Sequence, residues 1–407
     1  MTTIAEPPAF PRLQFTMADP SQQELVSIVV PCRNEGRFIE ACLRSVLAFE
    51  CPASVGIEVL VMDGCSTDET KALAQKIANT DSRVRVLDNP GRIQSTAVNL
   101  GIRAARGTWI MRLDAHARYP ANYLRICYET ARRSGADNVG GLFITEARGP
   151  GYQAQLVQAL TTHRFGVGDA GYRTGGGEAW VDTVPYGFFD RRVFERLGWL
   201  DERLVRAQDY EFNRRLIAAG GRIRRNPAIR VFYYNQPTLS AFYWKQFSRE
   251  APYNAYLWYL APYAFAVRHA ITAVFAAGVI AGPLCATLLP WCGAVYGGLL
   301  TLYALLAFIS ALQQAVRFRR PTHAILLPFC FFAYHFLHGC GVLWGLIRLA
   351  TCTAPVQKIK EPWTGAGRFR AWPAPSPGST GAGRESGRSN EARSETKSAG
   401  AANDVKP

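Results

Sequence analysis

The chain has 407 residues, more than one compact domain of ordinary size, which suggests two or three structural units. Hydrophobic residues make up 48% and charged residues 19%, which excludes global disorder and collagen-like sequence, because both lack the apolar surface of a core. The 46 Lys and Arg against 31 Asp and Glu give a net charge of +15, so polyanionic partners have to be considered: nucleic acid, anionic lipid or a phosphorylated substrate.

The first 24 residues contain four prolines and no continuous apolar run. They lack the charged start and apolar core of a signal peptide, so we expect a flexible N-terminal segment over residues 1–24 and a following domain that stays in the cytosol. The ten cysteines include no CxxC pair and no histidine cluster at zinc spacing, which argues against a disulfide framework or a structural zinc site.

Residues 25–250 are predicted to form one α/β domain. Short β-branched runs alternate with segments of helical periodicity, with strands expected at 25–30, 58–62, 84–87 and 109–113 and helices at 38–48, 70–78 and 95–105. This rhythm predicts a mostly parallel sheet with flanking helices. Glu35, Asp63 and Asp114 follow strands at the edge where such sheets bind ligands. A lone carboxylate there is as often a helix cap or turn former, so the set carries the argument.

The C-terminal third is predicted to be a membrane domain. Residues 251–267 mix Tyr and Trp with aliphatic residues and carry no charge, which favours an interfacial segment or, alternatively, a buried soluble helix. Residues 268–350 contain three apolar stretches long enough to cross a bilayer, at 270–289, 292–312 and 324–347. We therefore expect about three transmembrane helices after the α/β domain.

The charges around these stretches predict their orientation. Arg317, Arg319 and Arg320 form a basic turn that belongs on the cytosolic side, together with the preceding domain. Three spans would then place residues 351–407 outside, although this tail is basic and reads as disordered. The sidedness of the tail stays open.

Four motifs resemble those of family 2 glycosyltransferases with the GT-A fold, and the resemblance covers about residues 25–250. The motifs are VSIVVPCRNE at 26–35, VMDGCSTDET at 61–70, MRLDAH at 111–116 and QDYEFNRR at 208–215. Among the three acidic positions, the resemblance implies that Asp63 accepts a hydrogen bond from uracil, a task that needs a fixed acceptor at a strand end. The full set of residues expected to bind the nucleotide-sugar is Pro31, Asn34, Glu35, Asp63, Arg92, Asn99 and Asp114.

Some of these assignments have alternatives. Asp63 could instead cap the following helix. Arg92 could meet diphosphate oxygens as a planar, permanently charged fork, or be an ordinary surface arginine. Asn99 could fix its helix to the rim of the site. These alternatives stay open at the level of the sequence.

Asp114 and His116 occupy the place of the family's DxD metal motif, which implies a divalent metal ion, Mn²⁺ or Mg²⁺, as cofactor. Hard ions prefer oxygen ligands whereas imidazole suits softer ones, so a histidine at the third position leaves Mn²⁺ plausible and makes the site less clear-cut. His116 could also bind substrate or be a loop residue.

Asp209 occupies the place of the family's catalytic base, which implies removal of the acceptor hydroxyl's proton in a single inverting displacement. Glu is common at the position before it, where this chain has Gln208. Glu211 is the nearest rival for the base. The sequence QFSR resembles the QxxRW motif of processive synthases only weakly, and makes Gln246 and Arg249, with Gln208, candidates for acceptor or loop contacts.

The leading hypothesis is a multi-pass enzyme of the bacterial inner membrane with a cytoplasmic catalytic domain. It would move a sugar, with glucose expected, from a UDP-sugar to a polyprenyl-diphosphate-linked saccharide in exopolysaccharide or related glycan synthesis, together with other polysaccharide-assembly proteins. The alternatives are a processive synthase and a nucleotide-sensing transporter subunit. Nucleic acid is not an expected partner, because the basic residues do not share a predicted face with stacking aromatics.

Overall fold

The computed structural model describes residues 24–356 and the short strands β10 (Trp363–Thr364) and β11 (Arg368–Phe369). The predicted flexible segment up to residue 23 and most of the predicted tail lie outside the described residues.

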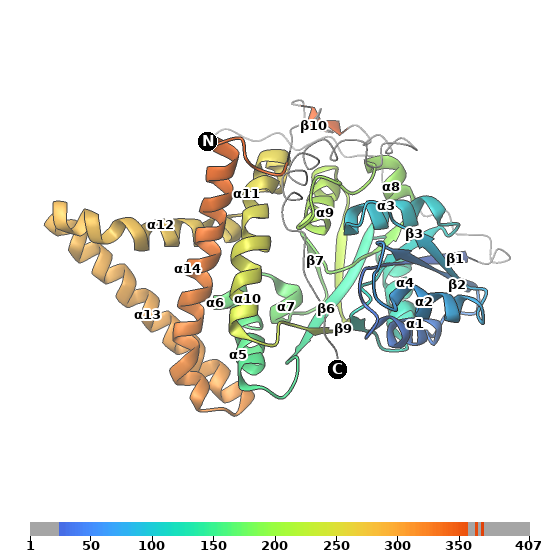
Figure 1. Cartoon of the computed structure of the whole chain (residues 1–407), viewed down its shortest axis with the longest axis horizontal. Coiled ribbons are helices and arrows are strands. Elements are labelled where there is room, and N and C mark those ends of the chain that lie inside the picture. Colours follow the sequence, from blue (N-terminus) through green and yellow to red (C-terminus); the bar gives the residue numbers. More distant parts are fainter. Residues whose placement is uncertain (1–23, 357–362, 365–367, 370–407) are drawn as a thin grey trace, which may run out of the picture. The chain divides into compact units, whose positions relative to one another are not determined.

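Nine of the described strands form one mixed sheet (Figure 1). Its parallel half has the order β3 (Val84–Asp88), β2 (Val55–Asp63), β1 (Glu24–Cys32) and β4 (Trp109–Arg112). The order continues with β8 (Phe188–Asp190), β6 (Asn138–Glu146), β9 (Ile223–Tyr234) and β5 (Ala117–Arg118), while β7 (Ala179–Val181) pairs with β9. The α/β prediction is confirmed. The second half is less parallel than predicted, because β8 runs opposite to both of its neighbours.

Helices cover both faces of the sheet. On one face lie α1 (Ile39–Leu47), α2 (Thr70–Ala78) and α4 (Tyr123–Ser134), and on the other α3 (Gln94–Ala104), α8 (Arg192–Leu197) and α9 (Gln208–Ala218). Because successive side chains of a strand point to opposite faces, Ile28 packs with the first set and Val29 with the second. Burial on both faces explains why β1 reads as a continuous apolar run.

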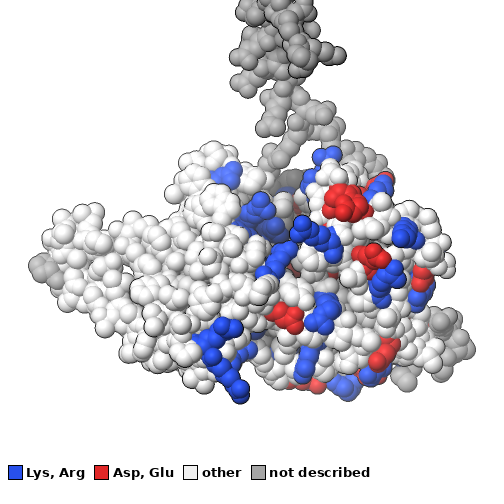
Figure 2. Space-filling model, turned by 60° about the horizontal axis from the view of Figure 1, so that its bottom comes forward, with Lys and Arg blue, Asp and Glu red and all other residues white. Residues whose placement is uncertain are grey.

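Three long apolar helices follow the α/β domain: α12 (Val267–Leu288), α13 (Pro290–Phe318) and α14 (Thr322–Ala350). All three have the length and composition to cross a membrane, and they contain the three predicted stretches almost completely. Figure 2 shows this part of the molecule as nearly uncharged, with Lys and Arg gathered where it meets the charged domain. Exposed apolar side chains over α12 and α13, such as Val274 and Leu299, are what a lipid-facing surface requires.

The predicted aromatic segment forms α11 (Ala251–Leu260) and a short 3₁₀ helix, Pro262–Ala264. Helix α11 runs beside α14 (Figure 1) and approaches it closely, because a Cβ at Gly341 or Gly345 would collide with its backbone or with the residues just before it. Tyr256 and Leu257 are buried, while Tyr259 and Phe265 are exposed. A location at the membrane interface stays a prediction.

The basic turn between α13 and α14 lies against α5 (Tyr152–Thr161) and the residue after it. Arg317 Nη1 donates to the Thr162 carbonyl at 3.0 Å, and Gln314 donates to the Ala159 carbonyl. These contacts place the basic turn against the α/β domain.

Candidate active site

A buried arginine joins two carboxylates at the carboxyl end of β4. Arg112 Nη2 donates to Asp114 Oδ1 at 2.6 Å, and Nη1 donates to Asp209 Oδ2 at 2.9 Å. The Arg112 side chain is only 5% exposed. A buried charge needs such partners, since an unpaired one costs several kcal/mol. The structure thus brings Asp114 and Asp209, which are distant in the sequence, to one guanidinium.

The surroundings of Asp209 suit a proton acceptor. Burial raises its pKa, Arg112 opposes this effect, and the nearby charge of Asp114 adds to it, with a net pKa above the ordinary value. A carboxylate with a raised pKa binds a proton more strongly and is a better general base. Asp209 lies in the first turn of α9, where the helix dipole favours its ionised form.

Two glutamines extend this network. Gln94, the first residue of α3, donates to Asp114 Oδ1 at 2.9 Å, and Gln208 donates to the Gln94 side-chain oxygen. Gln208, the residue before Asp209, is therefore an amide donor linked to Asp114 through Gln94. Sequence reasoning missed Gln94 and Arg112, although a charge inside the fully buried strand β4 was a signal for Arg112.

Loops around these residues hold a left-handed backbone at non-glycine positions. Positive φ angles occur at Asn34, Cys65, Arg92, Tyr186 and Ala207. Such conformations are sterically costly for residues with a Cβ and gather at functional sites. Ala207 directly precedes the residue pair that begins α9, so the strained turn sets the direction in which Asp209 enters the site.

Asp63 ends β2 with one oxygen free. Its side chain is 1% exposed, Oδ2 accepts from the Ser66 N–H at 3.1 Å, and Oδ1 is buried with no hydrogen-bond partner in the described part of the chain. An unpaired buried acceptor is unfavourable until a donor arrives. Strand β1 lies between β2, which ends at Asp63, and β4, which Asp114 follows closely. Two strand spacings correspond to about 10 Å, so Asp63 and Asp114 are about this far apart across the sheet.

Other residues predicted to bind nucleotide-sugar shape the same edge. Pro31 lies in β1 beside Met62 of β2. Asn34 Oδ1 accepts from the Thr67 N–H at 2.9 Å, which ties the loop after β1 to the loop after β2. The Arg92 side chain is exposed and makes no polar contact with any described residue, so it is free to meet a ligand.

Asn99 differs from its prediction. Its amide nitrogen donates to the Leu200 carbonyl and to Glu202, and its oxygen accepts from the Leu200 N–H at 2.9 Å. The side chain is buried, and both ends of its amide are used within the protein. The assignment of Asn99 to direct nucleotide-sugar binding is therefore corrected to the alternative, in which it fixes α3 to a neighbouring loop.

Asp114 and His116 each keep one potential metal-ligating atom without a hydrogen bond to a described residue, although the two side chains line different cavities. Asp114 uses Oδ1 for Arg112 and Gln94, and Oδ2 makes no hydrogen bond to a described residue. His116 Nδ1 lies 3.0 Å from Glu35 Oε1, the arrangement by which a carboxylate orients a ligating imidazole through its other nitrogen. Burial lowers the pKa of His116, but the Glu35 hydrogen bond and the Asp114 charge outweigh it and raise the pKa.

The described residues contain no cluster of three or more potential metal ligands. Mg²⁺ and Mn²⁺ sites in nucleotide-dependent enzymes commonly take one or two protein ligands and complete their coordination with substrate phosphates and water. The donor set present fits a metal bound in that way and not one held by the protein alone.

Comparisons with known proteins show the family to which the chain belongs. The sequence profile described as Glycosyl transferase family 2 matches residues 27–198. Succinoglycan biosynthesis protein ExoA of Rhizobium meliloti (strain 1021) is 33% identical over 235 residues, which cover 56% of this chain and 69% of ExoA. The chain belongs to glycosyltransferase family 2.

Two further comparisons extend beyond the catalytic domain. A dolichyl N-acetyl-alpha-D-glucosaminyl phosphate 3-beta-D-2,3-diacetamido-2,3-dideoxy-beta-D-glucuronosyltransferase of Methanococcus voltae is 25% identical over 341 residues, covering 79% of this chain and 97% of the relative. The mannosyltransferase PcManGT of Pyrobaculum calidifontis, solved in complex with GDP-Man and Mn²⁺, superposes with a TM-score of 0.51 at 18% identity, over 81% of this chain and 88% of that one. The predicted GT-A fold and glycosyltransferase class are confirmed.

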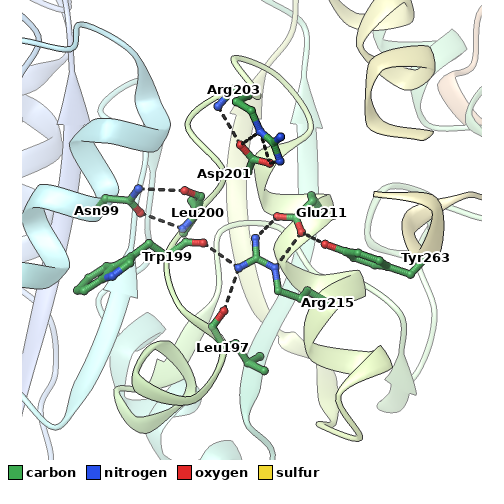
Figure 3. A network of polar contacts seen from close by, with 9 residues as sticks. All are labelled: Asn99, Leu197, Trp199, Leu200, Asp201, Arg203, Glu211, Arg215 and Tyr263. Carbon is green, nitrogen blue, oxygen red and sulfur yellow. Dashed lines mark hydrogen bonds and ion pairs between the residues drawn. The ribbon is translucent and has the colours of Figure 1, made fainter. Parts of the chain in front are cut away.

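In this glycosyltransferase, a buried polar network fixes the helix that carries Asp209 (Figure 3). Arg215 Nη2 donates to Glu211 Oε2 at 2.5 Å, and both side chains are 1% exposed. Arg215 also donates to the carbonyls of Leu197 and Trp199, while the Tyr263 hydroxyl donates to Glu211. The rival base Glu211 therefore has a structural role: it ties α9 to the segment that leads into α12.

Arg215→Met should destabilise the enzyme strongly. The change leaves Glu211 buried without its cation, and breaking a buried pair from one side costs about 3–5 kcal/mol. Thermal unfolding of the detergent-solubilised protein measures the loss as a lower melting temperature. Arg230→Met is the matched control, because Arg230 is exposed and makes no polar side-chain contact with a described residue. Equal melting temperatures of the two variants would contradict the assigned role.

A cavity of about 860 Å³ opens from the active site of the glycosyltransferase. Its lining includes Gln94, Arg112, Asp114, Gln208 and Asp209 at the catalytic end and, from α12, α13 and α14, Thr272, Phe275, Tyr303, Tyr334, His335 and His338. Gln246 also lines it, whereas Arg249 is exposed and does not. Both lie in a π-helical turn, Gln246–Glu250. The cavity thus joins the carboxylates to the apolar helices.

Proposed function

We propose that this enzyme transfers a sugar, expected to be glucose, from a UDP-sugar to a lipid-linked saccharide, with inversion at the anomeric carbon. The observation that carries the proposal is the cavity, which has Asp209 at one end and side chains of α12, α13 and α14 at the other. A soluble acceptor would need no route from the base to apolar helices, whereas a saccharide attached to a membrane lipid does.

The free oxygen of Asp63 supports a uridine nucleotide as the donor. Uracil presents an N–H donor in its ring, and Asp63 Oδ1 is a buried acceptor without a partner among the described residues. Arg92 is exposed and its side chain makes no polar contact with a described residue, so it is available to bind the diphosphate. From Asp63, the nucleotide would extend along the strand ends toward Asp114. The archaeal mannosyltransferase with GDP-Man and Mn²⁺ supports a nucleotide diphosphate and a divalent ion in this fold.

Asp209 would accept the proton of the acceptor hydroxyl as its oxygen attacks the anomeric carbon from the side opposite the diphosphate. One carboxylate suffices for this displacement, since no covalent glycosyl intermediate is formed. Arg112 holds Asp209 in place and keeps it ionised before the attack. A divalent ion bound by Asp114 and His116 would neutralise the charge that develops on the leaving UDP.

The relatives support a role at the membrane. The name of the Methanococcus voltae protein describes transfer to a dolichyl-phosphate-linked sugar, and ExoA is a succinoglycan biosynthesis protein. We infer a multi-pass protein of the bacterial inner membrane that acts in polysaccharide assembly. The contact between Arg317 and Thr162 keeps the basic turn beside the catalytic domain, which the charge rule assigns to the cytoplasm.

Membranes that contain the enzyme should transfer label from one UDP-sugar, with UDP-glucose expected, into the lipid extract. Chelation with EDTA should abolish this transfer, and added Mn²⁺ or Mg²⁺ should restore it. Without the metal ion, Asp114 and His116 provide no positive charge to neutralise the diphosphate as it departs. The measurement is radioactivity in extracted lipid-linked saccharide. Asp114→Ala should abolish transfer even with excess metal. Full activity in chelator would remove the metal from the proposal, and label only in long polymer would favour a processive synthase.

A further inference from the structure

The cavity contains more positive than negative side chains. Six Lys or Arg and four Asp or Glu line it. Most of these cations have carboxylate partners: Arg268 pairs with Asp169 and Asp182, and Lys245 and Arg206 approach Glu250. The remaining excess of positive charge identifies the cavity as a place for an anion.

Arg173 is one of two arginines in the cavity lining that have no carboxylate partner among the described residues. It belongs to the short helix α7 (Gly171–Thr174). Its guanidinium carbon lies 5.1 Å from the ring centre of Phe143, 5.4 Å from Tyr172 and 5.5 Å from Tyr233. Burial lowers its pKa, but the tyrosines around it outweigh this effect and keep it charged. Aromatic faces stabilise a cation, and they leave its N–H donors without ionic acceptors.

Arg173 lines the same cavity as Asp209 and as side chains of the three apolar helices. Tyr334 of α14 lies near enough to interact with it electrostatically, and both line the cavity that begins at Asp209. Arg164 also lacks a carboxylate partner among the described residues, but its side chain is exposed at the surface. Arg173 is therefore the enclosed cation that a ligand entering from the apolar helices would meet.

We propose that Arg173 binds a phosphate oxygen of the lipid-linked acceptor and so positions the acceptor saccharide toward Asp209. A guanidinium matches phosphate with two parallel hydrogen bonds, and the anion would neutralise a charge that the protein leaves uncompensated. The inference rests on the proposed function, because it names how that acceptor is held. It predicts that the enzyme distinguishes acceptors by the charge of the linkage between saccharide and lipid.

The test uses the full chain in phospholipid-free detergent micelles and two acceptors that carry the same saccharide. One has a short polyprenyl diphosphate, and the other an uncharged alkyl chain of similar length. The wild-type enzyme should prefer the diphosphate acceptor about 10- to 100-fold in KM, as expected for charge-assisted hydrogen bonds. In Arg173→Gln this preference should fall to a few-fold, with KM for the UDP-sugar unchanged. Arg173→Lys should retain part of it.

Controls separate this idea from its alternatives. Arg230→Gln removes an exposed arginine outside the cavity lining and should keep the full preference. An unchanged preference in Arg173→Gln, or an equal loss with both acceptors, would overturn the role of Arg173 in binding phosphate. A defect of Arg173→Gln that is equal for both acceptors and appears only in phosphatidylcholine nanodiscs would assign Arg173 to phospholipid headgroups instead. If the wild-type enzyme used neither acceptor, the result would contradict the proposed function itself.

Discussion

Asp209→Asn should lower kcat for sugar transfer about 1,000-fold while leaving the affinity for UDP unchanged. The amide has nearly the same shape and can still accept from Arg112 Nη1, but it cannot take a proton from the acceptor hydroxyl. Removing a general base costs typically 10²- to 10⁴-fold. Initial rates of labelled sugar transfer measure the loss, and calorimetric titration with UDP measures nucleotide affinity.

The matched control is Asp81→Asn, because Asp81 lies before β3, at the amino end of that strand, and Arg83 is its only ionic partner among the described residues. It should transfer sugar at the wild-type rate. If Asp209→Asn kept more than a tenth of wild-type kcat, the base would have to be another residue. Glu211 is a poor substitute, because its carboxylate already accepts from Arg215 and Tyr263.

The sequence predicted the parallel half of the sheet because each strand there is a short β-branched run followed by a polar residue. Asp63 and Asp114 could be found for the same reason, since the ends of parallel strands share one edge. The three apolar helices could be predicted from the sequence alone, because a run of about 20 apolar residues without charge is recognised without knowing how it packs.

Residues that act across long sequence distances could not be placed in this way. Arg112 follows three apolar residues at the end of β4, and only the fold shows that its guanidinium reaches Asp209 of α9. Asn99 is polar within a helical pattern, which a ligand contact and a structural contact explain equally well until Leu200 is seen beside it. Arg173 lies in the short helix α7, within a glycine-rich segment without apolar periodicity, and residues of the distant helix α14 complete the cavity that it lines.

Arg112 therefore becomes the most informative residue that the sequence alone did not identify. It touches both Asp114 and Asp209, and it lowers the pKa of Asp209 against the effect of burial. Without it, the partly buried Asp209 carboxylate would face the negative charge of Asp114 with no cation between them, and the pKa of Asp209 would rise. Loss of Arg112 would therefore change both the position of the Asp209 side chain and its affinity for a proton.

Arg112→Met should reduce kcat at neutral pH by at least 100-fold and change its pH dependence. Asp209 works as a base only when deprotonated, so the rate should rise with pH through its pKa. Removing Arg112 raises this pKa further, and the acidic limb of the kcat profile should move to higher pH.

Arg112→Lys, which keeps a charge without the planar guanidinium, should recover part of kcat and shift the acidic limb less. Rates measured from pH 5 to 9, with melting temperatures to exclude unfolding, test this. A kcat loss with an unmoved acidic limb would mean that Arg112 supports the fold but does not control the proton affinity of Asp209.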